Sequence, residues 1–307
     1  MGEATEMNSS ERRRDSFHQA RRFMYTEARL LERLLFAVRF EGAPAEPVGA
    51  LIRAYQNPDG GLGHALEPDL RCPESQPLFV GVGLQALRDA GLRDRDLSLR
   101  LCSFLESVSD DSGFVPLILP SALHWPRAAH WSSLWEPGIN PTAEICGLLH
   151  YQGVEHPWLE RATRACCDVL LHEPPREAHA LLSAVRLVEH LPDRELAAAL
   201  AERIADALPD ASFFVASAPV TQYGLTPLHL APAPNSPMRR FFTQEQIDAH
   251  LADLAARQQE DGGWPITWDP PPGQAPRSEW RGRMTLEAVS CLVAYGWIDC
   301  SEPANER

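Results

Sequence analysis

From residue 17 onward, hydrophobic positions recur every three to four residues, which is the spacing of amphipathic helices. No stretch shows the alternation of period two that marks a half-buried strand. The pattern therefore predicts an all-α protein. The helices are expected over residues 17–40, 45–56, 76–91, 94–107, 141–153, 157–172, 177–191, 194–208, 244–259 and 284–297.

The expected helices are of two kinds. Residues 78–84 and 286–295 are apolar on nearly every side, which is typical of buried helices. Residues 194–207 and 244–258 are amphipathic and charged, which is typical of surface helices. Because the two kinds alternate along the chain, the pattern predicts an inner layer of helices wrapped by an outer layer.

A short motif repeats where amphipathic helices end. Residues 56–62 read Gln-Asn-Pro-Asp-Gly-Gly-Leu, residues 258–264 read Gln-Gln-Glu-Asp-Gly-Gly-Trp, and weaker copies lie at 111–114 and 210–213. Most copies are about 50 residues apart, the length of a helical hairpin with its loops. Aspartate and glycine suit the turn that ends a helix, so the motif is interpreted as structural.

The motif Gln-x-x-Asp-Gly-Gly-Trp resembles the QW repeat of squalene-hopene cyclases and a related repeat of protein prenyltransferase β-subunits. Both belong to the terpenoid cyclase and prenyltransferase superfamily. The resemblance spans residues 17–298 and implies an α/α toroid of about 10–12 helices, with inner and outer helices alternating around a central cavity that holds the active site.

The chain departs from that superfamily in three motifs. It lacks the Asp-x-Asp-Asp motif of class II cyclases and the Asp-Asp-x-x-Asp motif that binds a magnesium–diphosphate cluster. Asp69 and Cys72 do not have the spacing of the prenyltransferase zinc site. The resemblance therefore implies the fold more strongly than a particular reaction.

Composition narrows the class of protein. The 307-residue chain is 44% hydrophobic, which is enough for a large core. A single domain is expected over residues 15–300, with a disordered tail at 1–14 and a short tail at 301–307. The net charge of -14 argues against binding nucleic acid or an anionic membrane. All 28 basic residues are Arg, so Schiff-base, pyridoxal phosphate and P-loop chemistry are excluded.

Cysteine usage and hydropathy suggest where the protein works. The seven cysteines form no C-x-x-C pair, so neither a disulfide framework nor a zinc ribbon is expected. No signal peptide and no apolar run of membrane-spanning length is present. We expect a cytoplasmic protein without an integral membrane segment. The sequence leaves the cofactor and the oligomeric state open, and a bound metal is not expected.

In the toroid that the resemblance implies, the loops that lead into inner helices gather on one rim. These loops are long here, at 62–76, 115–140, 214–242 and 265–283. Six of the eight tryptophans lie in or beside two of them, namely Trp125, Trp131, Trp135, Trp264, Trp268 and Trp280. Aromatic side chains around a cavity suit an apolar, cationic or sugar-like ligand, but the same residues can simply fill the ring as core.

The first rim loop has the densest group of candidate catalytic residues. Asp69 is the expected acid–base group, supported by Glu67 and His64, because carboxylates and imidazoles carry general acid–base catalysis. The alternative is a solvated loop in which Arg71 pairs with Glu67 or Asp69. Ligand-binding positions are expected at Arg71, Trp125, His130, Trp131, Asn140, Tyr223, Trp264, Trp268, Glu279 and Trp280. Histidines within helices, such as His179, are interpreted as structural.

The sequence favours an enzyme that acts on an apolar or isoprenoid-type small molecule in a central, Trp-lined cavity by acid–base chemistry. Two alternatives stay open. One is a carbohydrate-active toroid, in which Asp69 and Glu279 would form the carboxylate pair of a glycoside hydrolase or lyase. The other is a toroid that binds a ligand or partner without catalysis.

Overall fold

The computed structural model describes residues 9–301 and confirms the all-α prediction. Within these residues there are no extended strands, only isolated β-bridges between loops. The helices are α1 (Ser9–Glu27), α2 (Leu30–Phe40), α3 (Glu46–Ala54), α4 (Pro77–Asp89), α5 (Arg95–Val108), α6 (Ile139–Gln152), α7 (Pro157–His172), α8 (Ala178–His190), α9 (Arg194–Ala207), α10 (Pro227–Leu230), α11 (Gln244–Ala256) and α12 (Gln274–Ala294).

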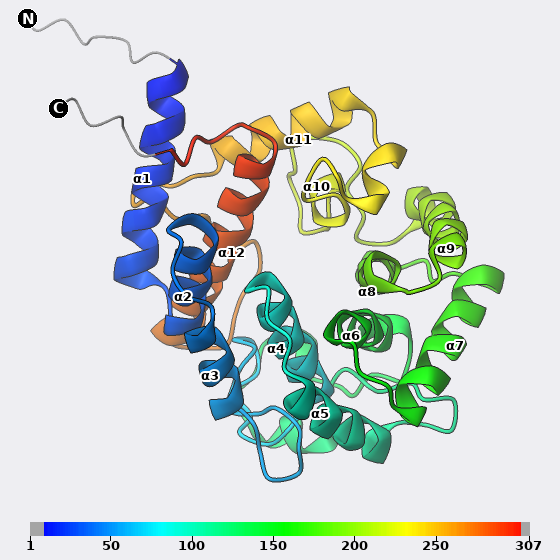
Figure 1. Cartoon of the computed structure of the whole chain (residues 1–307). Coiled ribbons are helices and arrows are strands. Elements are labelled where there is room, and N and C mark those ends of the chain that lie inside the picture. Colours follow the sequence, from blue (N-terminus) through cyan, green and yellow to red (C-terminus); the bar gives the residue numbers. More distant parts are fainter. Residues whose placement is uncertain (1–8, 302–307) are drawn as a thin grey trace, which may run out of the picture.

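The helices differ in whether they face the interior of the molecule. Figure 1 shows α4, α6, α8 and α12 around the middle, with α1, α5, α7 and α9 outside them. Each even-numbered helix from α2 to α12 contributes residues to the lining of one cavity, as do α9 and α11, whereas α1, α3, α5 and α7 contribute none. Helix α1 packs against both α12 and α2, so the two ends of the described chain lie side by side.

The repeated motif ends helices as the sequence analysis expected. In the first copy the Asp59 carboxylate accepts from the backbone N–H of Gly61, and in the second copy Asp261 accepts from Gly263 in the same way. Gly262 has φ +90°, a conformation that favours glycine. The bulky residue that ends the second copy is buried Trp264, whose indole N–H donates to the Leu254 carbonyl. The motif thus fastens each turn to the core.

Two predicted helix starts are confirmed. Thr243 and Gln246 form a capping box at the start of α11, the helix predicted to begin at residue 244. Asn140 has an extended backbone, and the helical residues of α6 begin after it with Pro141. Both helix starts depend on adjacent residues, which is why the sequence predicts them.

Three predicted boundaries differ from the structure. Residues 17–40 form two helices, α1 and α2, separated at Ala28 and Arg29 although no glycine or proline marks the break. Helix α12 begins at Gln274, ten residues before the predicted start, so Glu279 and Trp280 lie on a helix and not in a loop. Helix α1 begins at Ser9, within the predicted tail, while residues 1–8 and 302–307 lie outside the described residues.

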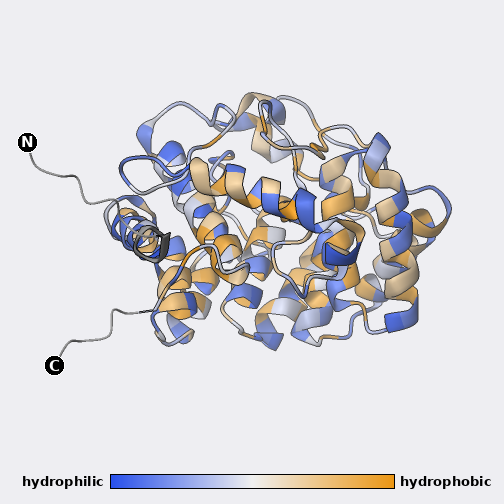
Figure 2. Cartoon of the chain, turned by 90° about the horizontal axis from the view of Figure 1, so that it is seen from above, coloured by the Kyte–Doolittle hydropathy of each residue, from blue (hydrophilic) through white to orange (hydrophobic). Residues whose placement is uncertain are grey.

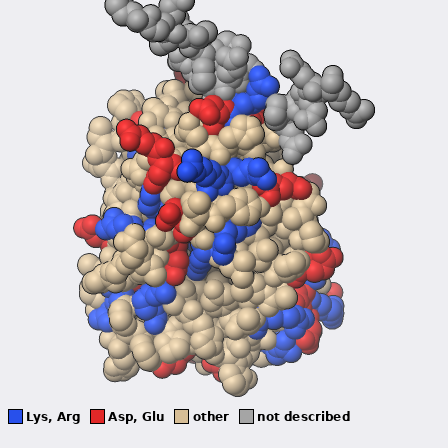
Figure 3. Space-filling view, turned by 90° about the vertical axis from the view of Figure 1, so that its left-hand side faces the viewer, with Lys and Arg blue, Asp and Glu red and all other residues tan. Residues whose placement is uncertain are grey.

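The surface mixes polar and hydrophobic residues. Figure 2 shows hydrophilic and hydrophobic residues interspersed along the helices. On the face in Figure 3, Arg side chains alternate with Asp and Glu side chains and form no large patch of one sign. In residues 9–301, no helix combines the length and hydropathy that crossing a membrane requires.

Candidate functional site

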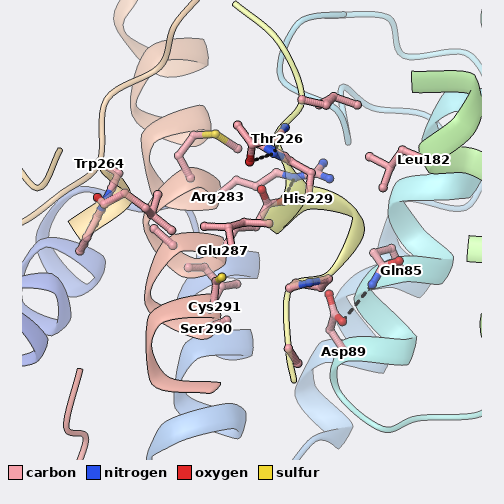
Figure 4. A pocket seen from close by; sticks show the side chains of 18 of the residues that line it. Gln85, Asp89, Leu182, Thr226, His229, Trp264, Arg283, Glu287, Ser290 and Cys291 are labelled. Carbon is pink, nitrogen blue, oxygen red and sulfur yellow. Dashed lines mark hydrogen bonds and ion pairs between the residues drawn. The ribbon is translucent and has the colours of Figure 1, made fainter. Parts of the chain in front are cut away.

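A cavity of about 900 Å³ lies among the even-numbered helices. Its size is that of pockets that enclose a small organic ligand. Figure 4 shows Arg283 and Glu287 of α12 reaching toward His229 of α10, with Gln85 and Asp89 of α4 on another wall. The structure therefore brings side chains from widely separated segments to one space.

Much of the cavity wall is charged, and most of the charges are paired. Arg283 donates to Glu287 at 2.8 Å, and Arg186 donates to Glu189 at 3.0 Å. Arg257 and Asp253 form a further pair at 2.9 Å. Apolar positions and three tryptophans, Trp264, Trp268 and Trp280, complete the lining. The wall thus offers hydrogen-bonding and aromatic surface to the same ligand.

Glu144 of α6 differs from the other acids of the wall. Its carboxyl group has no hydrogen bond or ion pair to any residue in the described part of the chain. Burial raises the pKa of Glu144, and the positive charges of Arg186 and Arg283 only partly counteract this. Its backbone is held by an N–H bond to Ser183 Oγ at 2.9 Å. Glu144 is therefore an unpaired carboxyl group in the cavity lining, on a backbone that Ser183 holds.

His229 is a second titratable group of the interior. The backbone N–H of Thr226 donates to His229 Nδ1 at 2.9 Å, which leaves Nε2 for other contacts. Burial lowers the pKa of His229, so the ring favours its neutral form. Figure 4 shows a second contact of the same nitrogen, with the Thr226 hydroxyl at 2.9 Å, at the start of α10.

Asp69, the expected acid–base group, lies behind the cavity wall. Its carboxylate accepts from Trp280 Nε1 at 2.7 Å and from Trp268 Nε1 at 2.9 Å, and His130 Nε2 is 3.4 Å from the same group. Burial raises the pKa of Asp69 to about 6, against the effect of the two indole bonds. Asp69 itself does not line the cavity, whereas both tryptophans do. It therefore acts as an anchor for two residues of the wall.

Glu67 is buried next to Asp69. Its Oε2 is buried without a hydrogen-bond partner in the described structure. Burial, together with the negative charge of Asp69, raises the pKa of Glu67 to about 8. At neutral pH this carboxyl group is therefore mostly protonated.

The structure does not gather all members of the first rim loop. His64 is exposed, has φ +58°, and makes no side-chain bond that joins it to Glu67 or Asp69 in the described residues. Arg71 forms an ion pair with Glu279 at 2.6 Å, so the predicted pairing of Arg71 with Glu67 or Asp69 is wrong. The pairing of Arg71 with Glu279 joins this loop to α12.

The remaining expected ligand residues separate into two groups. Tyr223, Trp264, Trp268 and Trp280 line the cavity, although Trp280 reaches it from a helix. Residues of loop 115–140 do not line it: Trp131 is buried, Trp125 is 37% exposed, and neither these two nor His130 nor Asn140 is part of the wall.

A hydrogen-bonded group at the rim was not expected from the sequence. Glu177 Oε1 pairs with His179 Nδ1, and His179 Nε2 lies 2.8 Å from the Tyr223 hydroxyl. We call Glu177, His179 and Tyr223 the rim triad. His179 was interpreted as structural because it stands alone on a helix, and its partner Tyr223 is 44 residues away. The local sequence gives one sign of this group, the acidic residue Glu177 at the start of α8.

Among residues 9–301, no group of three His, Cys, Asp or Glu side chains is arranged to hold a metal ion. No protein-family model and no curated protein matches the chain.

Proposed function

We propose that this protein is an α/α-toroid enzyme that performs acid–base chemistry on a small molecule in its central cavity. The ligand would combine an apolar, isoprenoid-type part with an oxygen-rich part. The observation that carries the proposal is Glu144, a carboxyl group without a partner that faces the cavity with a raised pKa.

The alternation of the lining supports the toroid. Successive even-numbered helices contact one another in the order α2, α4, α6 and α8, and α12 contacts α2. The odd-numbered helices α1, α3, α5 and α7 stay outside the cavity lining. Residues of α9 and α11 join the lining as well, so the alternation that supports a toroid is clearest from α1 to α8.

Glu144 is assigned as the acid–base residue. Groups with perturbed pKa values in a cavity are typical of active sites. Its raised pKa favours a protonated group that donates to a ligand and then takes the proton back. Arg186 and Arg283 lie within electrostatic range of Glu144 and would bind the oxygen-rich end of the ligand.

The tryptophans would bind the apolar part of the ligand. Trp268 and Trp280 meet edge to face, with ring centroids 4.8 Å apart, and Asp69 holds both indole N–H groups. Their rings are therefore presented to the cavity in a fixed orientation. In this account Asp69 and Glu67 hold residues of the cavity wall in place. Glu144 is the acid–base residue, a role that the sequence analysis expected of Asp69.

The test is turnover by the wild-type protein and two matched variants. Farnesol and farnesyl diphosphate serve as isoprenoid probes, and products are followed by mass spectrometry. Glu144→Gln is expected to reduce the rate by about 100-fold or more, because general acid–base catalysis contributes that much. Glu202→Gln makes the same change on an exposed residue of α9 and is expected to leave the rate unchanged.

A carbohydrate-active enzyme is the second candidate, favoured by the paired charges and tryptophans of the wall. Nitrophenyl glycosides in the same assay separate the two classes. Release of nitrophenol, lost in Glu144→Gln, would assign the sugar class. Binding of a probe without any turnover would instead support a non-catalytic role.

A further inference from the structure

The rim triad is organised from α8 outward. Both Glu177 oxygens accept backbone N–H bonds, from His179 at 3.0 Å and from Ala180 at 2.9 Å, so the carboxylate caps the helix and has a fixed orientation. The same carboxylate pairs with His179 Nδ1. Because a carboxylate only accepts, Nδ1 carries the proton. In the neutral ring Nε2 is then an acceptor for the Tyr223 hydroxyl.

Tyr223 is held at the cavity by packing on two sides. Its ring lies 5.8 Å from that of His179 at an interplanar angle of 14°, and it meets Trp268 edge to face at 6.0 Å. The loop that carries Tyr223 is closed by a hydrogen bond from the Leu225 N–H to the Phe213 carbonyl at 2.7 Å. Tyr223 lines the cavity and is 41% exposed, so its hydroxyl is accessible to a ligand.

We propose that Glu177, His179 and Tyr223 form a proton relay that ends at the Tyr223 hydroxyl, which meets the ligand. This rests on the proposed function, to which it adds a second acid–base group. When the Tyr223 oxygen takes a proton from a ligand hydroxyl, its own proton passes to His179 Nε2. The resulting imidazolium is stabilised by the Glu177 carboxylate, and the proton returns by the same route.

The surroundings favour a protonated phenol in the resting protein. Burial and the charges of Glu177 and Asp69 raise the pKa of Tyr223, so the phenol transfers a proton only in concert with His179. The three residues are arranged as in enzymes where a carboxylate orients a histidine and the histidine activates a nucleophile or base.

The relay can be tested without knowing the ligand, by acetylation with N-acetylimidazole. The Tyr223 oxygen attacks the acetyl carbon, and its proton passes to His179. The C–N bond to the imidazole breaks, and His179 returns that proton to the departing imidazole. Peptide mapping by mass spectrometry gives the rate at each tyrosine. Tyr25 is the internal control, because it is 44% exposed and its hydroxyl pairs with a carboxylate, that of Glu41, in place of a histidine.

We expect Tyr223 to be acetylated at least about 10-fold faster than Tyr25, in line with the contribution of a positioned general base. His179→Gln should remove this advantage without altering the Tyr25 rate, and Glu177→Gln should reduce it. An unchanged Tyr25 rate and an unchanged circular dichroism spectrum show that each variant is folded. Equal rates at the two tyrosines in the wild type, or a Tyr223 rate that His179→Gln does not change, would overturn the relay.

The outcome is independent of the cavity ligand. Fast, His179-dependent acetylation together with failure of every turnover probe would leave the relay standing and reject the proposed substrate class. Slow acetylation, together with turnover that Glu144→Gln abolishes, would reject the relay and leave the proposed function standing.

Discussion

Glu67→Gln should remove much of the pH dependence of the protein's stability. In the wild type, Glu67 is buried beside Asp69, and its Oε2 has no partner in the described structure. Its pKa rises from 4.5 to about 8 in the folded protein. The folded state therefore binds a proton over a pH range in which the unfolded chain has released it.

The sign follows from this difference in bound protons. Stability is highest below the pKa of the unfolded chain, and it falls as the pH rises toward the folded pKa. With about 1.4 kcal/mol for each unit of difference in pKa, the wild type should lose about 3 kcal/mol through Glu67 between pH 5 and pH 8. In Glu67→Gln the amide is neutral at every pH, so this loss should disappear.

The assay is urea unfolding of both proteins at several pH values between 5 and 8. Any packing cost of the amide is the same at every pH, so the difference in unfolding free energy between the two proteins reports the titration of Glu67 together with its electrostatic coupling to Asp69. We expect the variant to gain about 3 kcal/mol relative to the wild type across this range. A difference that stays constant with pH would show that Glu67 ionises normally and would refute the reasoning.

Two further substitutions test the fold and the wall. Gly262→Ala should cost more than about 2 kcal/mol, because φ is +90° and the new Cβ would lie 2.2 Å from the Gln19 carbonyl oxygen. Gly296→Ala, with φ +73° and open space, should cost about 1 kcal/mol, and equal losses in urea unfolding would contradict this account. Asp69→Asn places an amide N–H against an indole donor, so unfolding at pH 7 should become about 1–3 kcal/mol easier and the near-ultraviolet circular dichroism weaker. An unchanged spectrum would mean that Asp69 does not fix Trp280.

The helical fold was predictable because its signals are local. The period of hydrophobic residues gave the all-α class, and the capping box at Thr243 needs only the next three residues. The break between α1 and α2 was missed because it depends on distant partners. There Arg29 donates to the carbonyl of Leu66 and pairs with Glu32.

The candidate site was only partly predictable for the same reason. The prediction singled out Asp69, Trp268 and Trp280, and the structure joins all three by hydrogen bonds. It gave no sign that the carboxylate lies behind the wall. Glu144 was missed because nothing beside it in the sequence marks it. Its environment comes from Arg186 and Arg283, which lie on two other helices.

The central claim, that the ligand binds in the cavity, is tested most directly by blocking it. Leu182 of α8 lines the cavity, and Figure 4 shows its side chain on the wall that faces α12. Leu182→Trp would fill open space without displacing core residues. The measurement is the dissociation constant of farnesyl diphosphate for the wild type and this variant by calorimetry. The account predicts measurable binding that weakens at least about 10-fold, the loss of about 1.4 kcal/mol. Binding of equal strength to both proteins would contradict it.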